Sequence, residues 1–269
     1  MDLRKLFYDD SDSDSEHSVA DNLKGIGNLE INNNGNDENI TCWIFGYGSL
    51  CWNPGFTYTK CVTGYIRGFV RRFWQGSISH RGTPDKPGRV ATLCAEKEGI
   101  TWGCAYKITG RTALEYLKQR ECTIGGYVTL DSKFFPRVAT CDTEFRGEAF
   151  PVLVYIATDQ NSLWVGDLPI QSIAEQISES SGASGHNVEY VIRLADFMRE
   201  EIPNETDDHL FDLEHRIIQI LIKRNTPIHS LMGIPPERIR RDSHANIERP
   251  TTFEFASRVP DKKLRCLNV

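Results

Sequence analysis

The pattern of apolar and polar residues predicts strands in the first part of the chain. A short apolar run at 41–45 indicates a buried strand. Residues 61–74 are rich in β-branched and aromatic side chains with interior glycines, which is typical of a strand that bends or bulges. The runs 89–98 and 101–108 meet at Gly99, so we expect them to form a hairpin.

One predicted helix and three further predicted strands follow, and three predicted helices come last. Residues 111–121 suit a helix, which the glycines at 125 and 126 would end. Three further strands are predicted at 127–135, 136–142 and 150–159. Apolar residues recur at helical spacing over 170–177, 188–198 and 210–221, which predicts three successive helices. Strands that precede helices favour an α+β class over alternating α/β.

The charges divide the chain into three parts. Residues 1–41 hold ten acidic and three basic side chains with many Ser and Asn, so we expect a disordered acidic leader. Residues 223–269 hold ten basic and five acidic side chains with scattered Pro, and we expect a basic, poorly ordered tail. The remaining 42–222, with a net charge of −4, has the length of one domain.

Composition excludes several classes of protein. No run of 18 apolar residues exists, so we expect no membrane partner, and the first residues lack the apolar core of a secretory signal. The basic tail has no aromatic or Gly-rich binding motif, so we expect no nucleic-acid partner. Eight Cys without CxxC and seven His without HExxH indicate reduced thiols in a cytoplasmic protein without a metal site. The oligomeric state stays open.

The first candidate for chemistry is the turn Gly46-Tyr47-Gly48-Ser49-Leu50 after the first strand. A Gly-x-Gly-Ser turn exposes consecutive backbone N–H groups, which can hold a carboxylate or an oxyanion. It lacks the third Gly of a dinucleotide fingerprint and the Lys of a phosphate loop. A tight turn without a ligand explains the same residues.

Two further sets of polar residues are candidates. Glu121 ends a predicted helix just before a Gly-rich turn, where it is either an exposed carboxylate or a general base. Arg71 and Arg72 are adjacent on a predicted strand and therefore point to opposite faces. Arg72 and Gln75 are candidates for orienting an anionic substrate, with an ordinary charged strand edge as the alternative.

Taken together, these pieces resemble the ChaC family of γ-glutamylcyclotransferases. Order and spacing agree from residue 43 to about 222. The matching stretches are 43–50 (WIFGYGSL), 71–77 (RRFWQGS), 80–82, 87–90, 102–106, 120–121 with 125–127, 173–177, 185–190 (GHNVEY) and 208–210. The three residues between Glu121 and Gly125 match one of two forms of the family.

The resemblance implies a fold, a reaction and site residues. The fold is a γ-glutamylcyclotransferase-like mixed β-barrel with flanking helices. The reaction cleaves glutathione into 5-oxoproline and Cys-Gly in the cytoplasm without a cofactor. The residues implied in binding the γ-glutamyl group are Gly46, Tyr47, Gly48, Ser49, Leu50 and Cys51. Glu121 matches the proton acceptor, and Tyr127 and Tyr190 are candidates for pocket walls or for core positions.

Two alternatives remain beside this interpretation. The first keeps the chemistry but changes the substrate to other γ-glutamyl amino acids or amines. The second is a non-catalytic γ-glutamyl-binding adaptor that acts through its charged tails.

Overall fold

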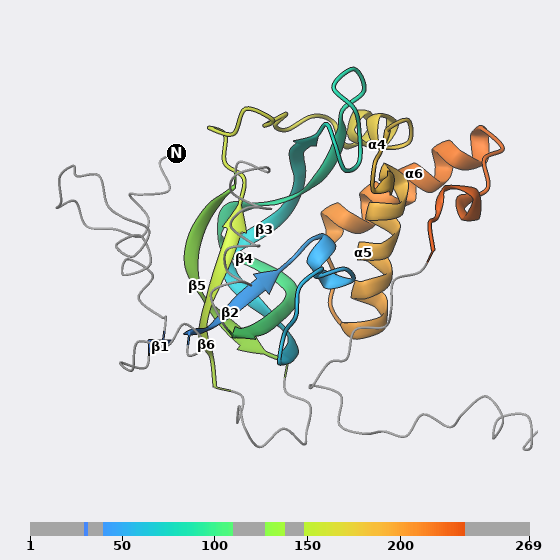
Figure 1. Ribbon diagram of the computed structural model, residues 1–269. Coiled ribbons are helices and arrows are strands. Elements are labelled where there is room, and N and C mark those ends of the chain that lie inside the picture. The colour runs from blue at the N-terminus through green and yellow to red at the C-terminus, as the bar shows by residue number, and fades with distance from the viewer. Residues whose placement is uncertain (1–29, 32–39, 110–126, 138–147, 235–269) are drawn as a thin grey trace, which may run out of the picture.

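Five strands close into a mixed barrel in the computed structural model, which describes residues 30–31, 40–109, 127–137 and 148–234 (Figure 1). The strands are β2 (Ile40–Gly46), β3 (Lys60–Ser77), β4 (Gly88–Thr109), β5 (Val128–Pro136) and β6 (Phe150–Ile156). Their order is β2–β4–β3–β5–β6, and β6 pairs back with β2. The β2–β6 pairing is parallel, whereas the other pairings are antiparallel. At the edge, the two-residue β1 (Glu30–Ile31) pairs with β2.

β4 is one continuous strand, so the predicted hairpin at Gly99 is wrong. Both halves of β4 pair with β3, and the register shifts where Arg67 faces Ile100 and Phe69 faces Ala95. Residues 96–99 therefore form a bulge within the strand. A Cβ atom at Gly99 would lie 2.7 Å from the carbonyl oxygen of Phe69, so the glycine permits the two backbones to approach closely.

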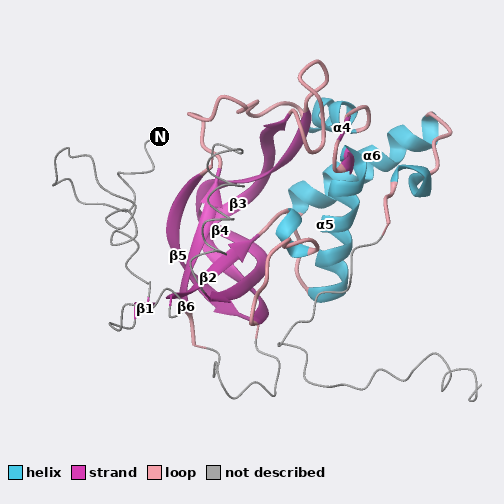
Figure 2. Ribbon diagram, viewed as in Figure 1, coloured by secondary structure: helices cyan, strands magenta, loops and turns pink. Residues whose placement is uncertain are grey.

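Three helices pack beside the barrel (Figure 2). They are α4 (Ile170–Ile177), α5 (Asn187–Glu201) and α6 (Asp208–Lys223), and the small hairpin of β7 (Ser181–Gly182) and β8 (Gly185–His186) precedes α5. Asp207 caps the start of α6: its side chain accepts a hydrogen bond from the backbone N–H of Leu210. The expected α+β class and the barrel with flanking helices are confirmed. The predicted helix at 111–121 and most of the predicted strand at 136–142 lie outside the described residues.

One apolar core joins the barrel to the helices. Its strand residues include Phe45, Phe73 and Phe134, and all three helices bury apolar side chains against it. The 3-10 helix η4 (Ile228–Leu231) follows α6 and packs its ends on the same core. The packed structure therefore continues past residue 223, where the sequence pattern predicts the start of a poorly ordered tail.

Candidate functional site

The predicted Gly-rich turn follows β2 directly and curls into the 3-10 helix η2 (Ser49–Cys51). Residues 46–51 (the 46–51 loop) lie between the barrel and α5 (Figure 1). Leu50 and Cys51 are buried, and Gly48 and Ser49 are half-buried. The loop is therefore seated inside the protein with its middle residues reachable from outside.

Every backbone carbonyl from residue 46 to residue 50 accepts a hydrogen bond from the protein. Arg71 Nε donates to the Tyr47 carbonyl at 2.9 Å, and the Tyr106 hydroxyl donates to the Leu50 carbonyl. The Gly46 carbonyl accepts from Cys51 Sγ, and the Gly48 and Ser49 carbonyls accept from the backbone N–H groups of residues 51–53. The carbonyls are thus all held inward.

The backbone N–H groups of Gly48 and Leu50 behave differently. Neither donates a hydrogen bond to any residue in the described part of the chain. Because the carbonyls from residue 46 to residue 50 are all satisfied, these two N–H groups can hold an anionic oxygen without competition from the loop's own acceptors. That this turn binds an anion stays a prediction.

Tyr190 of α5 lies directly against Gly48. A Cβ atom at position 48 would be 2.5 Å from the Tyr190 hydroxyl oxygen, so only glycine leaves room for this ring. The hydroxyl accepts a hydrogen bond from the backbone N–H of Ala91 at 3.2 Å. Trp52 and Phe73 meet the ring edge-to-face, and burial raises the pKa of Tyr190 to about 12. The phenol is therefore a neutral, fixed wall of the loop.

Arg71 ties the loop to two other segments. Its guanidinium is fully buried and forms an ion pair with Asp207 at the start of α6. It also donates to the Trp102 carbonyl on β4. Because burial of an unpaired charge is costly, this pairing explains how an arginine persists inside the barrel wall. The sequence pattern places the two adjacent arginines on opposite faces of a strand, and the candidate for the site is Arg72, not Arg71.

The structure brings some of the predicted site residues together and leaves others apart. Tyr190 contacts the loop, whereas Arg72 donates to the Arg71 carbonyl and Gln75 donates to Asn161 beyond β6. Tyr127 is half-buried and packs against the apolar core. Glu121, the predicted proton acceptor, lies outside the described residues.

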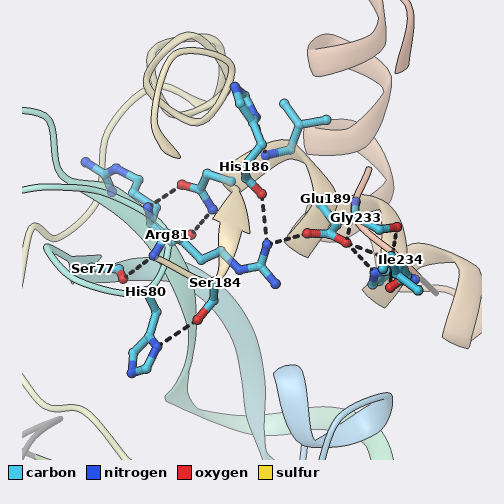
Figure 3. A network of polar contacts seen from close by, with 12 residues as sticks. Ser77, His80, Arg81, Ser184, His186, Glu189, Gly233 and Ile234 are labelled. Atoms are coloured by element: carbon cyan, nitrogen blue, oxygen red, sulfur yellow. Dashed lines mark hydrogen bonds and ion pairs between the residues drawn. The ribbon is translucent and has the colours of Figure 1, made fainter. Parts of the chain in front are cut away.

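A second polar network fixes α5 beside the loop (Figure 3). Arg81 donates to Glu189 at 2.7 Å and to the His186 carbonyl at 3.0 Å. Arg193 and the backbone N–H of Gly233 also donate to Glu189. Burial alone would raise the pKa of Glu189, but the hydrogen bonds from both arginines bring it below its ordinary value. This carboxylate is therefore a structural anchor rather than a base.

The remaining side chains give no sign of another type of site. No group of three His, Cys, Asp or Glu within the described ranges is arranged to hold a metal ion. Of the described cysteines, Cys42 and Cys94 are free thiols. None of the described helices has the length and apolar character needed to cross a membrane.

Comparison with known families points to the same part of the chain. A family model described as "ChaC-like protein" matches residues 42–220. The chain belongs to the ChaC family. The matched range contains the 46–51 loop, Arg71, Glu121 and Tyr190, and it ends within α6.

Individual ChaC relatives align over this range. Glutathione-specific gamma-glutamylcyclotransferase 1 of Danio rerio is 45% identical over 179 residues, which cover 65% of this chain and 88% of that protein. The Homo sapiens protein of the same name is 47% identical over 171 residues, covering 62% of this chain and 74% of that protein. A glutathione-specific gamma-glutamylcyclotransferase of Schizosaccharomyces pombe is 33% identical over 195 residues, which cover 65% of this chain and 91% of that protein.

A solved structure supports the fold. The crystal structure of a selenomethionine-labelled gamma-glutamyl cyclotransferase specific to glutathione from yeast superposes with a TM-score of 0.61. The two chains are 29% identical, and the superposition covers 66% of this chain and 96% of the yeast chain. The barrel with flanking helices is thus shared with a ChaC-type structure.

Proposed function

We propose that this protein is a glutathione-specific γ-glutamylcyclotransferase, which cleaves glutathione into 5-oxoproline and Cys-Gly in the cytoplasm. The observation that carries the proposal is the 46–51 loop, with its carbonyls held inward and the N–H groups of Gly48 and Leu50 left for a ligand. The names of the aligned ChaC relatives support the choice of glutathione over other γ-glutamyl compounds.

The reaction depends mainly on how the substrate is positioned. A γ-glutamyl unit carries its own nucleophile, the α-amine, which attacks its own δ-carbonyl carbon and closes a five-membered ring. The new C–N bond forms first and gives a tetrahedral oxyanion, and the C–N bond to the cysteinyl nitrogen breaks as this oxyanion collapses. Holding the chain curled can lower the barrier by several kcal/mol, up to about 7–11 in the best oriented cases.

The proton must move from the attacking nitrogen to the leaving nitrogen. In the proposed mechanism Glu121 takes the proton from the α-amine and delivers one to the leaving Cys-Gly nitrogen, a role worth about 10²–10⁴-fold. The N–H groups of Gly48 and Leu50 stabilise the substrate carboxylate or the tetrahedral oxyanion. Tyr190 closes one side of the loop, and the roles of Arg72, Gln75 and Tyr127 stay predictions.

Purified full-length protein incubated with glutathione tests the proposal. Mass detection should show 5-oxoproline and Cys-Gly accumulating in equal amounts. A panel of γ-glutamyl amino acids and amines at matched concentration serves as the specificity control. Equal rates across the panel would contradict glutathione specificity, and binding without turnover would favour the non-catalytic adaptor.

The assignment of the base is tested by Glu121→Gln. This change keeps the size and hydrogen-bonding capacity of the side chain but removes its ability to accept a proton, so we expect near-complete loss of 5-oxoproline release with folding unchanged. Glu175→Gln, at an exposed position of α4, is the matched control and should retain full activity. Wild-type turnover by Glu121→Gln would rule out the assigned mechanism.

A further inference from the structure

Arg71 occupies a position from which it controls the loop without facing the substrate. Its Nε atom donates to the Tyr47 carbonyl at 2.9 Å, and its other nitrogens are taken by Asp207 and by the Trp102 carbonyl. The guanidinium has no exposed surface. Because its three nitrogens all donate to protein groups and the guanidinium is buried, Arg71 is not placed to touch a ligand.

The Tyr47 carbonyl and the Gly48 N–H belong to the same peptide unit. That unit is planar and trans, so the two groups point in opposite directions. When Arg71 pulls the Tyr47 carbonyl toward the barrel wall, the Gly48 N–H is turned away from it. Gly48 N–H is also one of the two loop donors that no described residue occupies.

A terminal nitrogen of the Arg71 guanidinium is held by Asp207 at the start of α6. Asp207 accepts the ion pair through one carboxylate oxygen, and through the other it caps α6 by accepting from Leu210 N–H at 3.0 Å. Behind it, His209 accepts a hydrogen bond from the backbone N–H of Phe73 on β3 at 3.3 Å. The start of α6 is therefore attached to β3 at two points, and Arg71 cannot rotate without breaking both the ion pair with Asp207 and the contact with the loop.

We propose that Arg71, held by Asp207, is a positioning residue that aims the Gly48 N–H at the γ-glutamyl part of the substrate. This inference rests on the proposed function. Of the two roles proposed for the loop N–H groups, this inference takes the binding of the substrate α-carboxylate. That group carries the same charge in the substrate and in the transition state, so loss of the positioning weakens the binding of both equally. Such a loss raises KM and leaves kcat nearly unchanged.

The test uses full-length Arg71→Lys, which keeps the charge but loses the forked geometry that reaches Tyr47, Asp207 and Trp102 together. We expect KM for glutathione to rise at least tenfold while kcat falls by less than about threefold. A merely structural role would reduce the number of folded molecules, which lowers kcat and leaves KM unchanged. Arg216→Lys is the matched control, because Arg216 makes an exposed pair with Asp212 on the same helix.

Asp207→Asn provides a second variant in case Arg71→Lys does not fold. Asparagine caps helices as well as aspartate, so α6 keeps its start while Arg71 loses its charged partner. We expect a smaller rise in KM, of about threefold or more. An unchanged KM in every folded variant would overturn the inference.

Failure of the proposed function is recognised separately. If the wild-type protein does not turn over glutathione, calorimetric binding of glutathione replaces the kinetic readout. If the wild-type protein binds glutathione and Arg71→Lys binds it at least tenfold more weakly, the positioning role would be supported in a non-catalytic binder. Equal affinity of the two proteins, or no binding by the wild type, would overturn it.

Discussion

The contact between Gly48 and Tyr190 yields a prediction that is independent of activity. In Gly48→Ala the new methyl group would lie 2.5 Å from the Tyr190 hydroxyl oxygen, whereas ordinary contacts begin near 3.4 Å, so one group must move by about 0.9 Å. The Tyr190 ring cannot retreat easily, because Trp52 and Phe73 pack edge-to-face against it. Overpacking of this kind costs about 1–3 kcal/mol of the free energy of unfolding.

Removing the hydroxyl should remove most of this cost. Tyr190→Phe alone leaves the buried Ala91 N–H without its acceptor, a loss of about 1–3 kcal/mol. In that background, however, Gly48→Ala should cost less than about 0.5 kcal/mol, because the atom that the methyl group meets is absent. Urea unfolding of the four proteins, followed by tryptophan fluorescence, measures the coupling between the two positions.

A matched control and a refuting result are available. Tyr106→Phe also removes a phenolic hydroxyl that contacts the loop, at the Leu50 carbonyl, but should leave the cost of Gly48→Ala unchanged. If Gly48→Ala costs the same with and without the Tyr190 hydroxyl, within about 0.3–0.5 kcal/mol, the hydroxyl is not what excludes a side chain at position 48.

Two further predictions concern the polar contacts around the helices. Burial, reinforced by the charge of Arg72, lowers the pKa of His209 to about 4. Because the unfolded chain binds this proton below about pH 6.5, the free energy of unfolding should fall by roughly 3 kcal/mol from pH 6.5 to 4. His209→Gln keeps an acceptor for Phe73 N–H and should flatten this part of the profile in pH-dependent urea unfolding; an unchanged slope would contradict the assignment. Glu189→Gln should lower the free energy of unfolding by about 3–5 kcal/mol, because Arg81 and Arg193 lose their buried partner. Asp212→Asn, which breaks the exposed pair with Arg216, should change the free energy of unfolding little. Equal effects of Glu189→Gln and Asp212→Asn would contradict the role of Glu189 as a buried anchor.

The elements that sequence reasoning identified depend on local patterns. The three helices carry their own apolar period, and the Gly-rich turn follows a short apolar strand, so both could be predicted without knowledge of their neighbours. The strand at 89–109 was different. A glycine flanked by two strand patterns signals a hairpin turn and a bulge equally well, and only the pairing of both halves with β3 decides between them.

The choice between Arg71 and Arg72 could not be made from the sequence either. Side chains alternate between the two faces of a strand, but each bulge reverses the alternation. β3 has register shifts between residues 67 and 69 and between 72 and 75, on both sides of the arginine pair. Likewise, the segment after α6 carries scattered Pro and little helical period, and its packing depends on Glu189, 44 residues before Gly233.

The ion pair between Arg71 and Asp207 also sets an order of events during synthesis. The two residues are 136 positions apart, so a ribosome adding about 5–20 residues per second needs about 7 to 27 s to make the second after the first. Throughout that interval the nascent barrel contains a cation destined for burial but lacks its anion. The contact by which Arg71 orients the Tyr47–Gly48 peptide therefore lacks its anchor until Asp207, at the start of α6, has been made.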